Sequence, residues 1–224
     1  MQDLTLVIPA KYESESLPVF LNEIKHLKSK KLIVLQEDDD ETINSIREFK
    51  DIEILYQIDK GYGAAILEGI KHTSTSFFCI INADGSMNPD YLDKMLFKTK
   101  QNDLDFLFAS RYEKPGGGSD DDDFITSIGN FIFTKIGNVF FSLKITDILY
   151  TYVMGKTKSF NDLNLKSKDF TLCVEFPIKQ NKKKLLYSTI PSYERSRIGG
   201  KKKVNAFKDG LLILLKMIKM FFIK

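Results

Sequence analysis

Residues 77–86 read FFCIINADGS, in which an uninterrupted apolar run, Phe77–Ile81, is followed directly by the polar segment Asn82–Ser86. A short apolar run bounded by turn residues is typical of a strand that is buried on both faces of a parallel sheet. Upstream, the same order of apolar run and polar segment begins at Leu4 and again at Lys31. Polar side chains therefore stand at the ends of three predicted strands.

Helical patterns separate the apolar runs along the first half of the chain. The predicted strands are Leu4–Pro9, Lys31–Leu35, Ile52–Ile58, Phe77–Ile81 and Asp105–Ala109, and the predicted helices between them are Ser16–Leu27, Thr42–Phe49, Tyr62–Lys71 and Pro89–Lys100. Strands that alternate with helices of about ten residues indicate βαβ units. We therefore predict an α/β fold with a mostly parallel central sheet flanked by helices, whose functional loops lie at the carboxyl ends of the strands.

The second half of the chain is less regular, and no linker separates two domains. Residues 113–123 are rich in Gly and Asp and are predicted to form a loop. The predicted elements after this loop are the apolar helix Phe124–Leu143, the helix Phe170–Lys179, the strand Leu185–Ile190 and a C-terminal amphipathic helix, Val204–Ile223. No stretch contains the roughly 18 to 20 uncharged apolar residues of a membrane span, so none is predicted.

Charge is distributed unevenly along the chain. The 224 residues carry a formal net charge of +3, too close to balance to indicate a nucleic-acid-binding protein. Lys182–Lys224, however, contains 12 Lys and Arg residues against two acidic residues, whereas the rest of the chain contains 21 against 28. A basic tail on an acidic body predicts contact with an anionic partner such as phosphate or a lipid surface. Both cysteines lie in apolar runs and no signal peptide is recognised, so we expect a cytoplasmic protein.

Acidic and amide side chains at one edge of a parallel sheet predict a bound cation. Carboxylates gathered at the strand ends repel one another unless a cation or a ligand donor lies among them. Asp84, with help from Asn82 and Ser86, offers the oxygen ligands that hard divalent cations such as Mg²⁺ or Mn²⁺ take. We therefore expect a divalent cation there, with Asn82 weakening its binding relative to a second Asp.

The order and spacing of these segments resemble glycosyltransferase family 2, with its GT-A fold, and within it the branch of dolichol-phosphate mannose synthase and related polyprenyl-phosphate glycosyltransferases. The resemblance covers nearly the whole chain. The residues that match the family's motifs are Pro9, Ala10 and Glu13; Gly61, Gly63 and Ala65; Asp84 of an Asp-x-Asp motif; Ser110, Arg111 and Tyr112 with Gly116–Gly118; and Arg197, Gly200 and Lys203. The chain departs from the family pattern at Tyr12, Gln36, Asn82 and Lys202, where Asn, Asp, Asp and Ser are usual.

The resemblance implies roles for individual residues. The implied catalytic residues are Asp84, Asp147 and Arg197, and the implied metal ligands are Asp84, Asn82 and Ser86. The implied nucleotide-sugar-binding residues are Pro9, Ala10, Glu13, Glu37, Gly61, Gly63, Asn82, Asp84 and Arg111. The residues expected to contact a phosphate of the substrate or acceptor are Arg195, Arg197 and Lys203. Residues 1–203 would form the catalytic domain, with a nucleotide-sugar-binding half, 1–112, and an acceptor-binding half, 113–203, followed by the amphipathic helix 204–224.

The implied reaction is inverting, metal-dependent transfer of a hexosyl group from a GDP- or UDP-sugar. The favoured acceptor is a polyprenyl phosphate at the inner face of the membrane, where the protein would be peripheral. An ionised phosphate needs no general base, whereas the alternative acceptor, a glycan hydroxyl, does; for that role we rank Asp147 ahead of Glu175. A further alternative is a catalytically degenerate protein that only binds nucleotide-sugar. Whether the C-terminal helix contacts an anionic membrane, the catalytic domain or a second copy in a homodimer stays open, and no nucleic acid is expected as a partner.

Overall fold

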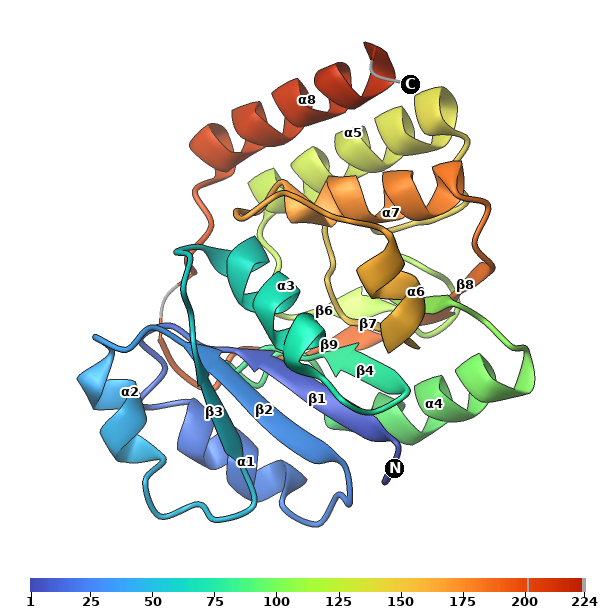
Figure 1. Ribbon diagram of the computed structural model, residues 1–224. Helices are drawn as coiled ribbons and strands as arrows, with labels where there is room; N and C mark the ends of the chain where they lie inside the picture. The colour runs from blue at the N-terminus through green and yellow to red at the C-terminus, as the bar shows by residue number, and fades with distance from the viewer. Residues whose placement is uncertain (201, 223–224) are drawn as a thin grey trace.

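A seven-stranded sheet forms the centre of the protein in the computed structural model, which describes residues 1–200 and 202–222 (Figure 1). The strands, in spatial order, are β3 (Glu53–Tyr56), β2 (Lys30–Leu35), β1 (Leu4–Pro9), β4 (Phe77–Ile80), β7 (Val153–Lys156), β5 (Phe106–Ser110) and β8 (Tyr187–Pro191). β7 runs antiparallel to β4 and β5, and the other pairs of this sheet are parallel. A short ribbon pairs β6 (Gly118–Ser119) with β9 (Tyr193–Glu194). The predicted α/β fold with a mostly parallel sheet is confirmed.

Helices cover both faces of the sheet. They are α1 (Leu17–Ile24), α2 (Asp40–Ser45), α3 (Tyr62–His72), α4 (Leu92–Gln101, after a 3₁₀ turn at Pro89–Tyr91), α5 (Phe124–Phe141), α6 (Thr157–Asp162), α7 (Leu172–Lys182) and α8 (Ala206–Phe222). Apolar residues of α1 and α4 pack on one face of the sheet, and those of α3, α6 and α7 pack on the other. α5 and α8 share a third apolar cluster with α7 and lie at the top of the molecule in Figure 1.

The interior strand β1 shows how the sequence produces this layered arrangement. All six of its residues are buried; Leu4, Leu6 and Ile8 join the core on one face of the sheet, and Val7 joins the core on the other. Because successive side chains of a strand point to opposite faces, a continuous apolar run suits a strand covered on both sides. The parallel pairing of β1 with β2 and β4 then brings the polar segments that follow these strands to one edge of the sheet.

The elements β7 and α6 and the two-residue strands β6 and β9 were absent from the sequence prediction. β7 has only four residues, Val153–Lys156, and one of them is Gly155. A Cβ atom at Gly155 would lie 2.4 Å from Cδ1 of Phe106, so the glycine lets β7 approach the side chain of β5. The predicted C-terminal helix is present as α8, and its predicted last residue, Ile223, lies outside the described residues.

One helix in the described part of the chain, α5, is long and apolar enough to cross a membrane by length and composition alone. Its 18 residues have a mean hydropathy of 1.2, and only 17% of them are buried. The sequence analysis predicted no span because it considered only runs without charged residues, and α5 contains Lys135.

Candidate active site

A cavity of about 430 Å³ opens at the carboxyl ends of the parallel strands. Residues at or just beyond the ends of β1, β2, β3, β4 and β5 line it, among them Ala10, Gln36, Gln57, Asp84 and Arg111. Ligands of open α/β sheets bind at this edge. The predicted site residues that line the cavity are Pro9, Ala10, Glu13, Gly61, Asn82, Asp84, Arg111, Arg197 and Lys203.

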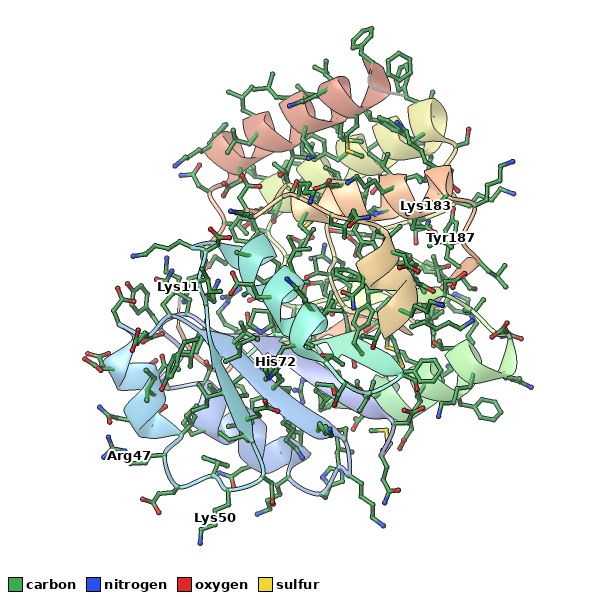
Figure 2. All side chains as sticks on the ribbon, viewed as in Figure 1. Lys11, Arg47, Lys50, His72, Lys183 and Tyr187 are labelled. Carbon is green, nitrogen blue, oxygen red and sulfur yellow. The ribbon has the colours of Figure 1, made fainter. Side chains whose placement is uncertain are left out.

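Only part of the basic tail reaches this cavity. Lys202 and Lys203 line it, whereas Lys183 lies on the other side of the molecule from the cavity residue Lys11 (Figure 2). Arg195, predicted to contact phosphate, points away from the cavity: its Nη1 and Nη2 atoms donate to the two carboxylate oxygens of Glu23 in α1, at 2.7 and 3.1 Å. Arg195 therefore ties the tail segment to α1 and does not line the cavity.

Asp84 presents its carboxylate at the end of β4. Its Oδ1 atom accepts hydrogen bonds from the Ser86 backbone N–H at 3.1 Å and from Ser86 Oγ at 2.9 Å. Its Oδ2 atom lies 3.6 Å from Nη1 of Arg197. Asn82 accepts a hydrogen bond from the Tyr62 hydroxyl at 2.9 Å through its Oδ1 atom. Of the three predicted metal ligands, Asp84 is thus the one whose oxygen faces the guanidinium of Arg197, whereas Ser86 is buried.

The donor set at Asp84 suits a cation that is shared with a ligand. No group of three or more His, Cys, Asp or Glu side chains that could hold a metal ion occurs among residues 1–200 and 202–222. Mg²⁺, however, is usually bound by one or two carboxylates together with phosphate oxygens of the substrate and water, and seldom by an all-protein cage. Asp84 can supply that carboxylate, with the Asn82 oxygen beside it, so the residues present fit such a cation.

Arg111 belongs to a buried network beside the cavity. Its Nε and Nη2 atoms donate to the two oxygens of Asp147 at 2.7 and 3.0 Å, and its Nη1 atom donates to Glu194 at 3.2 Å. Asn130 of α5 donates to Asp147 at 2.8 Å. The Asp147 side chain is fully covered, and Asp147 does not line the cavity. The carboxylate therefore holds Arg111 in position, and it presents no free oxygen to a ligand.

The cationic side chains of the tail that line the cavity form ion pairs with carboxylates. We use the name acidic loop for Asp120–Asp123, which precedes α5. Arg197 donates through Nε and Nη2 to Asp121 of the acidic loop at 3.0 and 2.6 Å. Lys202 lies 3.0 Å from Asp123, and Lys203 lies 3.2 Å from Glu13. The cationic side chains that would bind a phosphate thus have carboxylate partners within the protein.

Two of the acids in the cavity are held in an environment that disfavours their charge. Burial raises the pKa of Glu13, although a hydrogen bond from Ser16 and the charge of Lys203 act in the opposite direction. Burial likewise raises the pKa of Glu194, against the lowering effect of Arg111. The charges of these acids therefore depend on the neighbouring cations staying in place.

Gly61 and Gly63 are required by packing. Gly61 has φ +128°, and a Cβ atom there would lie 2.2 Å from the carbonyl oxygen of Lys168; a Cβ atom at Gly63 would lie 2.4 Å from that of Ser167. The glycines let the start of α3 approach the segment before α7. Gly61 lines the cavity, whereas Gly63 is buried and does not, so close packing accounts for Gly63.

Some cavity residues were missed by the sequence analysis. Tyr62, between the two glycines, stacks on Phe170 with ring centroids 5.1 Å apart and orients Asn82 through its hydroxyl. Glu194 is one of only two acidic residues in the basic tail, and this isolation could have indicated that it pairs with a cation. Gln36 lines the cavity in place of the predicted Glu37.

Tyr12, which stands where the family pattern has Asn, adopts a left-handed backbone conformation with φ 53°. Asn tolerates this region far better than Tyr does. Replacing Tyr12 with Asn is therefore expected to raise the free energy of unfolding by about 1 kcal/mol, which thermal denaturation would detect as a Tm increase of about 2–4 °C. Tyr12→Phe keeps the strain and should leave Tm unchanged; an equal Tm for Tyr12→Asn would contradict the explanation.

The fold matches solved structures of sugar transferases. The structure of glucosyl-3-phosphoglycerate synthase from Mycobacterium tuberculosis in complex with Mn²⁺ and UDP-glucose superposes with a TM-score of 0.73 at 10% sequence identity, covering 99% of this chain and 79% of that one. Mannosyl-3-phosphoglycerate synthase from Rubrobacter xylanophilus gives a TM-score of 0.71 at 12% identity, covering 96% of this chain and 72% of that one. At such identities the likeness establishes the fold.

The sequence itself carries the family assignment. The model of the family described as "Glycosyl transferase family 2" matches residues 5–163. This range contains the strand ends that line the cavity, including Ala10, Asp84 and Arg111. The chain belongs to glycosyl transferase family 2, as its motifs predicted.

Proposed function

We propose that this protein transfers a hexose, with inversion, from a nucleotide-diphosphate sugar to a polyprenyl phosphate at the cytoplasmic face of a membrane, in a metal-dependent reaction. Family membership supports glycosyl transfer as the class of reaction. The observation that carries the proposal is one cavity in which Asp84 and Arg197 lie together with the first turns of α5 and α8, represented by Thr126 and Asp209.

The donor would occupy the side of the cavity formed by the strand ends. The base and ribose would lie against Pro9, Gln36 and Gln57, and the diphosphate between Asp84 and Arg197. When bound by Asp84 and the diphosphate, a divalent cation would act as a Lewis acid on the leaving group. The Mn²⁺ and UDP-glucose of a structural neighbour support this choice. Arg197 would offer paired N–H donors to phosphate oxygens, and its neighbour Lys203 a further positive charge.

The acceptor would occupy the opposite side, against α5 and the tail. Thr126, Asn130 and Val204 line the cavity there. A polyprenyl phosphate is ionised at neutral pH and attacks without a general base. Asp147, the base ranked first from the sequence, has its carboxylate covered by Arg111 and Asn130. A carboxylate so placed acts as a positioning residue, which favours an acceptor that needs no base.

Transfer to a hydroxyl is the second candidate. Asp169, an exposed residue, lines the cavity and could accept a proton there. One structural neighbour was solved with phosphoglyceric acid, which is not a lipid. Glu175, the other base considered from the sequence, is bound instead by the N–H groups of Lys166 and Ser167 and does not line the cavity.

Release of nucleoside diphosphate by the purified full chain tests the proposal. GDP- and UDP-sugars would be supplied with Mn²⁺ or Mg²⁺, and with a short polyprenyl phosphate, 3-phosphoglycerate or an oligosaccharide. Metal-dependent release that only the lipid phosphate stimulates is the expected result. Stimulation by a hydroxyl acceptor would favour the second candidate. Donor binding without release under every acceptor would favour the degenerate binding protein.

Removing the charge of Asp121 is expected to strengthen donor binding. Asp121 holds Arg197 where the diphosphate would bind, so the donor has to displace it. For Asp121→Asn we expect a Kd for nucleoside diphosphate about fivefold lower, since a partly exposed ion pair is worth about 1 kcal/mol or less. Isothermal titration calorimetry measures this. Asp120→Asn is the control, because Asp120 pairs with the Tyr193 hydroxyl; weaker binding by Asp121→Asn would mean that this carboxylate helps to hold the donor.

A further inference from the structure

The helix α5 directs polar and small residues toward the protein and large apolar residues outward, the reverse of an ordinary surface helix. Its buried residues are Asn130, Thr134 and Gly137. Asn130 accepts a hydrogen bond from the Leu149 N–H at 3.1 Å, and Thr134 accepts one from the Ile148 N–H at 3.2 Å. In a helix on a water-exposed surface, the polar face points outward and the apolar face is buried. Here the polar face is bonded to the protein.

The apolar face of α5 is consequently exposed. Its exposed large apolar residues are Phe124, Ile125, Ile128, Phe131, Ile132, Val139 and Phe140. Phe131 is 63% exposed and Phe140 is 57% exposed. A contiguous exposed apolar surface of this kind marks a contact with another protein or with a membrane.

α8 extends this surface. It packs on the protein through Ile213, Met217 and Met220, and Lys216 forms an ion pair with the buried Glu175 of α7 at 3.3 Å. Its opposite side exposes Phe207, Leu211, Leu212, Leu214, Leu215, Ile218, Phe221 and Phe222. Figure 1 shows α5 and α8 side by side, and the rings of Phe140 and Phe221 lie 5.7 Å apart. Together the two helices carry 15 of the 24 exposed large apolar side chains of the described residues.

We propose that the outer faces of α5 and α8 form one platform that docks on an anionic lipid bilayer. The exposed lysines of the two helices are Lys135, Lys208 and Lys219 against the single acid Asp209, while Lys216 is paired with Glu175. Apolar residues beside lysines match the boundary between acyl chains and anionic headgroups. A second copy of the chain seated on the same face would bring like charges together, which disfavours it as the occupant.

Within this platform α5 lies flat on the bilayer and does not cross it. Its length of 18 residues corresponds to about 27 Å, close to the thickness of the hydrocarbon core. Crossing the bilayer would require α5 to leave the protein and to expose Asn130 and Thr134 to lipid. It would also remove the Asn130 partner of the buried Asp147 carboxylate. The platform would supply the membrane contact that the proposed function requires, and docking itself needs no sugar donor or acceptor.

The chain contains no Trp, so single Trp residues can report on each helix. We would prepare Phe131→Trp and Phe140→Trp in α5, Phe221→Trp in α8, and Phe97→Trp in α4, whose Phe97 is 66% exposed. Each full-length variant would be mixed with vesicles of phosphatidylcholine containing phosphatidylglycerol, with bromine at a shallow or a central position of the acyl chains. We expect shallow bromine to quench all three platform reporters about equally, and neither lipid to quench Phe97→Trp.

Other outcomes overturn the proposal in distinct ways. Central bromine quenching Phe131→Trp most strongly would mean that α5 spans the bilayer. Quenching confined to Phe221→Trp would remove α5 from the platform. No quenching, together with a dimer in sedimentation that Phe131→Glu dissociates, would assign the face to a second copy. With vesicles, Phe131→Glu is expected to weaken binding at least tenfold and Phe97→Glu to leave it unchanged; equal effects would refute a localised platform. None of these measurements depends on sugar transfer.

Discussion

Replacing Asp84 with Ala is expected to lower metal-dependent release of nucleoside diphosphate by about 10²–10³-fold, the usual loss when one electrostatic stabiliser of a transition state is removed. Asp84 supplies the carboxylate whose Oδ2 atom lies 3.6 Å from Arg197, at the end of β4. The leaving diphosphate gains negative charge as the glycosidic bond breaks. Without the carboxylate, no acidic residue remains in the segment Asn82–Ser86 to hold a cation against that charge.

Two comparisons separate this effect from damage to the fold. Asp90→Ala removes an exposed carboxylate of the 3₁₀ turn after β4 that does not line the cavity, and it should leave turnover unchanged. A higher Mn²⁺ concentration restores part of the activity when metal binding is only weakened. We expect no recovery in Asp84→Ala, because this variant has lost the carboxylate that holds the cation. Full activity of Asp84→Ala would remove the cation from the proposed mechanism.

Sequence patterns predicted the first half of the fold because its strands are continuous apolar runs. β1 and β4 are covered on both faces of the sheet. Their sequences therefore lack the alternation of polar and apolar residues that marks a strand at the surface. β7 gave no such signal, since a four-residue strand containing Gly155 is stabilised by its neighbours β4 and β5 and not by its own composition.

The sequence predicted the site residues that follow strands. It did not predict the ion pairs between residues that are distant in sequence. Asp84 and Arg111 follow strands, so the parallel sheet brings them to one edge. The partner of Arg111, Asp147, is 36 residues away, and nothing in the sequence reveals that its carboxylate is covered. The outward apolar face of α5 was hidden for a similar reason: periodicity identifies an apolar face, and only the hydrogen bonds of Asn130 show that it points outward.

The largest effect on stability is expected at Asp147. Removing one partner of a buried ion pair typically costs about 3–5 kcal/mol, and we expect the lower end here because Arg111 keeps Glu194 at 3.2 Å. In Asp147→Ala, Arg111 would lose its bidentate partner and Asn130 would lose its acceptor. Denaturant unfolding should show this loss, and Tm should fall by at least about 6 °C. Asp103→Asn is the control: the ion pair of Asp103 with Lys156 is equally short, at 2.7 Å, but Asp103 is 91% exposed, and Asn tolerates its backbone φ of 49°. The loss should therefore stay below about 1 kcal/mol.

The same residue separates a positioning role from a base. Asp147→Asn keeps the shape of the side chain while removing the carboxylate charge. Its NH2 group would face N–H donors of Arg111, so the bidentate contact with Arg111 is lost. If Asp147 positions Arg111, turnover should fall while the pH–rate profile keeps its shape, because the group that titrates in the reaction has not been removed. If Asp147 is the base for a hydroxyl acceptor, the acidic limb of the profile should disappear while donor binding persists. The buried pair thus links the stability of the fold to the acceptor question, since a carboxylate committed to Arg111 can take up a proton only by giving up that pair.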